Sequence, residues 1–168
     1  PVSDAYYNLI GNAVIDSGHF SSSDAKTAEQ QVYSIFQGKK TETISLLESE
    51  LQNSQASAYT DLSNEMKAYM DYICDTLLTK DTGILMSDQI DKNDATYIAW
   101  AKDETINLYT YLNYAISKNW IDTSKLGSSS YSSSEEIYQE ILKYLKEYLA
   151  DDSNFDKLLY KYLIKSGR

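Results

Sequence analysis

Arginine is almost missing from this 168-residue chain, as are histidine, cysteine and proline. Of its 15 basic residues, only the last, Arg168, is an arginine. The planar guanidinium of arginine is the usual bidentate ligand of phosphate, so phosphate recognition is not expected to be the main function. A genome rich in A and T would also favour lysine codons, and this compositional explanation of the pattern is preferred.

The single histidine and the single cysteine limit the chemistry of any site. A Ser-His-Asp or Cys-His arrangement would have to use His19, which follows Gly18 in a predicted turn. Structural zinc usually takes four Cys or His ligands, more than the chain contains. Cys74 has no partner for an internal disulfide, and Asp71 and Asp75 beside it disfavour a reactive thiolate. We therefore predict a protein that is not an enzyme and has no metal or cofactor.

Motifs for nucleotide and calcium binding are absent as well. No glycine-rich phosphate loop occurs. The acidic stretches 91–94 and 151–156 lack the glycine and the glutamate that an EF-hand needs. Adjacent carboxylates such as Glu135 and Glu136 point about 100° apart on a helix and do not form a dyad. Carboxylates that converge from different helices are the one enzymatic alternative.

Acidic residues outnumber basic ones, with 25 against 15. The net charge is −10 and the pI is about 4.5, which disfavours binding to nucleic acid and is compatible with a basic partner. Hydrophobic residues make up 42% of the chain, enough for a single globular domain over residues 1–168. Apolar runs are too short for a transmembrane helix.

Apolar residues recur at helical spacing, and no stretch alternates as a strand does. The predicted helices cover residues 6–15, 24–37, 41–79, 94–119, 134–150 and 153–164. Gly38 is expected to end the second helix, and Ser153 with Asp156 resembles a capping box for the last one. Residues 80–93 are predicted to form a connection between helices, with a short helical turn at 87–91.

The helix predicted over residues 41–79 is too long for a compact domain of this size. About 39 helical residues would span close to 60 Å, so the polar stretch 52–57 is expected to kink the helix or divide it in two. The predicted fold is therefore all-α, a single-domain bundle of five to seven amphipathic helices with one long or kinked member at about 41–79.

Six serines cluster within residues 128–134. Residues 127–131 are predicted to form a loop before the last helical hairpin. Ser132 with Glu135, and Ser133 with Glu136, both match a capping box at the start of the next helix. The same spacing is typical of acidic-directed phosphorylation, which is the less favoured alternative.

Tyrosine is the largest departure from average composition, with 16 residues. Rings at helical spacing can fill a core, form a contact surface or line a cavity for an apolar ligand. Core packing is the preferred interpretation. The contact-surface hypothesis names seven rings on two predicted helices: Tyr97, Tyr109, Tyr111, Tyr114, Tyr138, Tyr144 and Tyr148.

The C-terminal residues 154–168 combine an apolar stripe with a basic one. Lys157, Lys161 and Lys165 recur at intervals of four, so they share one side of a helix. Such a helix can bind a membrane surface or an acidic partner. A core helix whose lysines face water is the favoured alternative.

These observations predict a non-catalytic binding or interaction protein, with a protein partner or self-association. The alternatives are a bundle that holds an apolar ligand, and a secreted toxin or effector that acts through its basic C-terminal helix. The chain begins at Pro1 and ends in Ser-Gly-Arg, as expected after initiator removal or excision from a longer precursor. An extracellular location is slightly favoured over a cytoplasmic one.

Overall fold

The computed structural model describes residues 25–52, 64–102, 105–128, 130–155 and 157. Of the residues in these ranges, 72% are helical and none belongs to a β-strand, which confirms the all-α prediction. The chain divides into two compact units, one of Pro1–Ile44 with Tyr148–Arg168 and one of Ser45–Glu147. A single domain over the whole chain stays a prediction.

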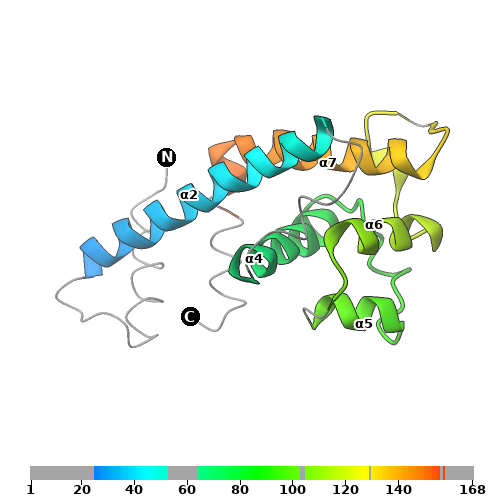
Figure 1. The fold of residues 1–168 in the computed structure, drawn as a ribbon, viewed down its shortest axis with the longest axis horizontal. Helices are drawn as coiled ribbons and strands as arrows, with labels where there is room; N and C mark the ends of the chain where they lie inside the picture. Colours follow the sequence, from blue (N-terminus) through cyan, green and yellow to red (C-terminus); the bar gives the residue numbers. More distant parts are fainter. Residues whose placement is uncertain (1–24, 53–63, 103–104, 129, 156, 158–168) are drawn as a thin grey trace. The chain divides into compact units, whose positions relative to one another are not determined.

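The first described helix, α2, runs from Ala25 to Gln52 (Figure 1). The prediction that Gly38 ends this helix is wrong, because α2 continues through it. Gly38 is exposed, and a Cβ at this position would meet nothing within 4 Å. A glycine inside a helix costs about 0.5–1 kcal/mol relative to alanine, a penalty that packing can offset. The next turn supplies such packing, since Lys40 and Thr43 are buried.

The long segment predicted over residues 41–79 contains the end of α2 and a second helix, α4, from Asn64 to Asp75. The expected break at 52–57 falls almost entirely outside the described residues. α4 passes directly into a π-helical turn, η2, from Thr76 to Asp81. The buried apolar side chains of α4 and η2 include those of Met66, Tyr69, Met70, Tyr72, Ile73, Leu77 and Leu78.

The connection after η2 is tied to a loop far along the sequence. Gly83 adopts φ of 70°, a conformation that favours glycine. An isolated antiparallel bridge then joins Leu85 to Ile121. The Met86 amide donates to the Trp120 carbonyl at 2.8 Å, as part of the same junction. Backbone pairing therefore joins the two ends of the segment between Leu85 and Ile121.

The prediction of one helix over residues 94–119 is wrong. The structure has two, α5 from Ala95 to Ala101 and α6 from Leu108 to Ser117 (Figure 1). The side chain of Asn107 accepts a hydrogen bond from the Thr110 amide and so begins a new helix. The apolar spacing alone gives no sign of this break.

Within the described residues, helix α7 runs from Ser134 to Ala150 after a short 3₁₀ turn, η3, from Thr123 to Lys125. The predicted capping box forms at Ser133, whose hydroxyl accepts from the Glu136 amide at 3.3 Å. The Glu136 carboxylate reaches back to the Ser132 amide at 2.6 Å, one residue earlier than the standard arrangement. Lys146 of α7 lies 3.7 Å from Glu48 of α2.

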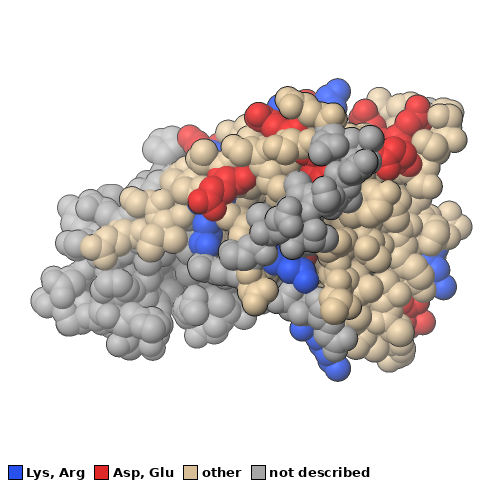
Figure 2. Space-filling view, viewed as in Figure 1, with Lys and Arg blue, Asp and Glu red and all other residues tan. Residues whose placement is uncertain are grey.

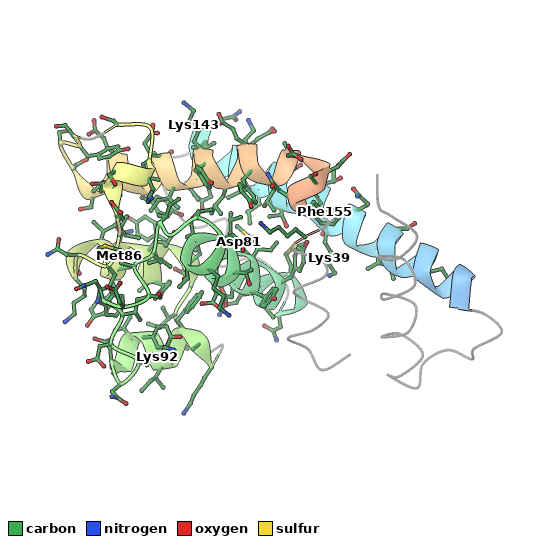
Figure 3. The ribbon with its side chains drawn as sticks, turned by 180° about the vertical axis from the view of Figure 1, so that it is seen from behind. Lys39, Asp81, Met86, Lys92, Lys143 and Phe155 are labelled. Atoms are coloured by element: carbon green, nitrogen blue, oxygen red, sulfur yellow. The ribbon has the colours of Figure 1, made fainter. Side chains whose placement is uncertain are left out.

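The unit that contains Tyr148–Arg168 has its own local contacts. The helical residues 152–155 begin after Asp151, whose carboxylate accepts from the Ser153 amide at 2.9 Å. Asp151 therefore caps this helix, and the prediction of Ser153 as its cap is wrong. Lys40 donates to Asp152 at 2.5 Å and lies over the ring of buried Phe155, which Figure 3 shows just beyond α7.

Candidate functional site

Two neighbouring helices of the Ser45–Glu147 unit contain no charged residue. Their sequences are ATYIAWA for α5 and LYTYLNYAIS for α6. The helices α2, α4 and α7 each contain at least four charged residues. Because 24% of the whole chain is charged, helices of 7 and 10 residues would together carry about four charged residues on average. The absence is therefore a property that sets α5 and α6 apart.

The charge-free helices lie at the protein surface. Their buried side chains are Trp100, Leu108, Tyr111, Leu112 and Ala115. We call the remaining side chains of α5 and α6, all of which are exposed or partly exposed, the neutral face. Figure 2 shows the surface over these helices as nearly continuous tan, with lysine and acidic side chains at its margins. Charge is usually excluded from the middle of a protein–protein interface and kept at its rim.

A stacked pair of buried aromatic rings lies on the buried side of α5 and α6. The ring of Trp100 lies parallel to that of Tyr111, with an interplanar angle of 4° and 4.0 Å between the centroids. The Trp100 indole N–H donates to the carboxylate of Asp71 on α4 at 3.2 Å. Tyr97 is tilted against both rings of the pair, 6.4 and 6.5 Å away. The partly exposed Tyr97 ring therefore rests on a buried base that joins three helices.

A second partly exposed ring is held by a hydrogen bond. The Tyr114 hydroxyl donates to Asp94 at 2.7 Å, and the Tyr114 ring lies edge-on to buried Trp120. The Asp94 carboxylate also caps α5, accepting from the amides of Thr96 and Tyr97. The hydrogen bond from Tyr114 is the main reason that the pKa of Asp94 lies below its usual range. Asp94 thus connects the start of α5 with the end of α6.

Two of the tyrosines that the sequence nominates as contact residues belong to the core. Tyr111 is 1% exposed and Tyr138 is 2% exposed, so neither can reach a partner in this conformation. Burial raises the pKa of both phenols. The nomination of these two as surface anchors is therefore corrected to core packing. Tyr109, whose ring packs edge-on against that of Tyr138 with 4.9 Å between the centroids, is a partly exposed residue.

The other nominated residues belong to neither α5 nor α6. Tyr144 and Tyr148 are partly exposed, one turn apart on α7, and Tyr144 has its pKa raised by partial burial and by Asp81. Lys157 is exposed. Lys161 and Lys165 lie outside the described residues, so membrane or partner binding through residues 154–168 stays a prediction. The apolar-ligand and toxin hypotheses stay predictions as well.

The described residues offer little for metal or thiol chemistry. Within the ranges that the structure covers, no cluster of three or more His, Cys, Asp or Glu side chains is placed to hold a metal ion. The Cys74 thiol is buried, and burial together with Asp71 and Asp75 raises its pKa well above the usual range. None of the helices in these ranges is long and apolar enough to span a bilayer.

Sequence reasoning missed the feature that distinguishes this surface. It nominated the tyrosines but overlooked Trp100, Trp120 and Asp94, which hold their rings in place. A usable signal was present, because the stretch from Thr105 to Ser117 contains no charged residue.

Comparison with protein-family models, curated protein sequences and solved structures finds no match to this chain.

Proposed function

We propose that this protein is a non-catalytic binding protein that contacts another protein through the neutral face. The proposal is carried by the absence of charge from α5 and α6, which lie at the surface of a chain in which 24% of the residues are charged. Removing charged side chains from water is costly unless they are paired, so a surface that a partner covers is expected to be depleted of them.

The tyrosines of the neutral face suit this role. Tyr97 and Tyr114 are partly exposed residues whose rings pack on Trp100, Tyr111 and Trp120. The ammonium group of Lys118 lies 5.7 Å from the centroid of the Tyr114 ring. A ring that is already immobilised loses little conformational freedom when a partner covers it. Tyrosine also combines a large apolar area with a hydroxyl, which is why it is common in binding surfaces.

Charged residues border the neutral face at the helix ends. Asp94 precedes α5, Lys102 follows it, and Lys118 follows α6. Lys92, labelled in Figure 3, lies just before α5 in the sequence. A neutral centre with charges at its border is the usual anatomy of a transient interface. The border charges would tune the rate of encounter, and the centre would supply the binding energy.

The test uses one substitution at two sites. Asn113→Lys places a charge on the neutral face, whereas Asn64→Lys makes the same change at an exposed position of α4. Immobilised wild type and both variants would capture proteins from an extract of the source, and self-association would be measured in parallel. We expect Asn113→Lys to abolish an interaction that wild type and Asn64→Lys retain. If both variants keep every interaction of the wild type, the neutral face is not a binding surface.

A further inference from the structure

We propose that α5 is a flap, which opens as a unit by local unfolding while α4, α6 and α7 stay folded. This inference goes beyond the proposed function and does not depend on it, because it concerns how α5 is held in place. Three features of the fold support it: the distribution of buried side chains, the length of α5, and the backbone pairing at the ends of the segment that contains it.

α5 is held in place by one buried side chain. All seven residues of α5 are described, and Trp100 is the only buried residue among them. α6, the next helix, has four buried residues, which are Leu108, Tyr111, Leu112 and Ala115. Every ordered residue loses conformational entropy, and the burial of apolar area is the main term that offsets this loss. α5 is therefore expected to open more readily than α6.

A helix of this length does not persist once it is detached. α5 has 7 residues, and isolated helices shorter than about 12–15 residues are marginal in water. Loss of the Trp100 contacts therefore unfolds α5 and does not release an intact helix. At the start of the flap, Asp94 accepts a hydrogen bond from the Tyr114 hydroxyl of α6 at 2.7 Å. This bond keeps Asp94 attached to α6 and marks where the flap begins.

Backbone pairing outside the flap keeps the rest of the unit closed. Leu85 and Ile121 form an isolated antiparallel bridge. Beside it, the Met86 amide donates to the Trp120 carbonyl at 2.8 Å. These contacts join the two ends of the segment without using any residue of α5. Opening of α5 therefore leaves this junction in place, and the opening stays local.

Opening changes the surface that the unit presents. In the closed form the Trp100 indole stacks on the Tyr111 ring, 4.0 Å between centroids, and donates to the Asp71 carboxylate at 3.2 Å. In the open form that side of the Tyr111 ring and that carboxylate oxygen lose their cover, and the Tyr97 ring loses its contacts with both rings. The unit thus has two surface forms, and a partner that prefers one of them shifts the equilibrium toward it.

Native-state hydrogen exchange of the full chain, resolved residue by residue, tests the flap. The probes in α5 are the amides of Ile98 and Lys102, which donate to the carbonyls of Asp94 and Ile98. The references are the amides of Leu142 and Leu145, two fully buried residues of α7. We expect the α5 amides to be protected at least about tenfold less, equivalent to an opening free energy lower by about 1.4 kcal/mol. Both α5 amides should share one protection factor, because the flap opens as a unit.

Two variants separate opening of the flap from unfolding of the whole unit. Trp100→Phe removes the indole N–H that bonds to Asp71, and it should accelerate exchange of the α5 amides about tenfold. Ser133→Ala removes the cap of α7, and it should accelerate exchange of the α7 amides. The α5 amides should not respond to Ser133→Ala, because the Ser133 contacts are the same whether α5 is open or closed.

The opposite results overturn the proposal. If the α5 amides are as protected as those of α7, or if Ser133→Ala accelerates both sets equally, α5 opens only when the whole unit unfolds. If Ile98 and Lys102 differ in protection, the helix frays from one end and is not a flap. If Trp100→Phe leaves exchange of the α5 amides unchanged, Trp100 does not hold the flap closed. These measurements need no partner, so their failure is distinguishable from failure of the proposed function.

Discussion

The hydrogen bond from the Trp100 indole to the Asp71 carboxylate attaches α5 to α4, and its contribution to stability can be measured. The two atoms are 3.2 Å apart, at the long end of the usual N–H···O range. Hydrogen bonds that involve a charged group contribute about 1.5–3 kcal/mol. Because this bond is long, we expect a coupling free energy of about 1.5 kcal/mol between the two side chains.

A double-mutant cycle isolates this term. Trp100→Phe removes the indole N–H and keeps an aromatic ring to stack on Tyr111. It is expected to destabilise the fold by about 2–3 kcal/mol, since buried aromatic area is lost together with the bond. Asp71→Ala removes the acceptor, and the other contacts of Asp71 cancel in the cycle where they are independent of Trp100. Urea unfolding followed by far-UV circular dichroism gives the four free energies of unfolding.

The chain supplies its own control for this cycle. Trp120 is also buried, and its ring contact is with Tyr114. Trp120→Phe and Asp71→Ala should be additive within about 0.5 kcal/mol, as expected for residues that do not interact. A Trp100–Asp71 coupling below about 0.5 kcal/mol, or one no larger than that of the Trp120 cycle, would refute the assignment of this bond as the attachment of α5.

Three further measurements test local features. Ser133→Ala should lower the free energy of unfolding by about 1 kcal/mol, because the hydroxyl caps α7. Ser134→Ala, at the first position inside the helix, is the control, and equal losses would contradict the cap. Asp94 has its pKa lowered from 3.8, so its contribution to stability is present at higher pH and is lost as pH falls below 3.8. Acid unfolding should therefore be less steep in Asp94→Asn, and an unchanged profile would argue against the Tyr114 bond. Cys74 should react with a thiol reagent only on unfolding, and fast labelling of the folded chain would contradict its burial.

The spacing of apolar residues was sufficient to predict the helices that end in strong local signals. α7 follows its predicted range of 134–150 because Ser133 and Glu136 form a capping box and its apolar stripe is uninterrupted. The start of α6 was missed because the cap at Asn107 lies within a stretch whose apolar period continues across the break. Gly38 was wrongly predicted to end α2, because a glycine usually weakens a helix. It is tolerated inside this helix, where Lys40 and Thr43 in the next turn are buried.

The candidate site could be predicted only in part. The sequence places Tyr97, Tyr109 and Tyr114 on amphipathic segments, and in the structure each of these residues is partly exposed. It could not separate these from Tyr111, because burial depends on how α5 folds back against α6. Stacking of Trp100 on Tyr111 requires the two helices to be separate and adjacent, and a single helix over 94–119 cannot provide that contact.

The all-α class follows from the spacing of apolar residues, and the absence of charge from 95–101 and 108–117 follows from composition. These properties are local and need no knowledge of distant contacts. The division of the tyrosines into buried and partly exposed ones depends on how the helices pack. The contacts responsible join residues far apart in the chain, such as Trp100 with Asp71 and Tyr109 with Tyr138. Side-chain burial is a property of packing between helices, so it becomes defined only when those helices meet.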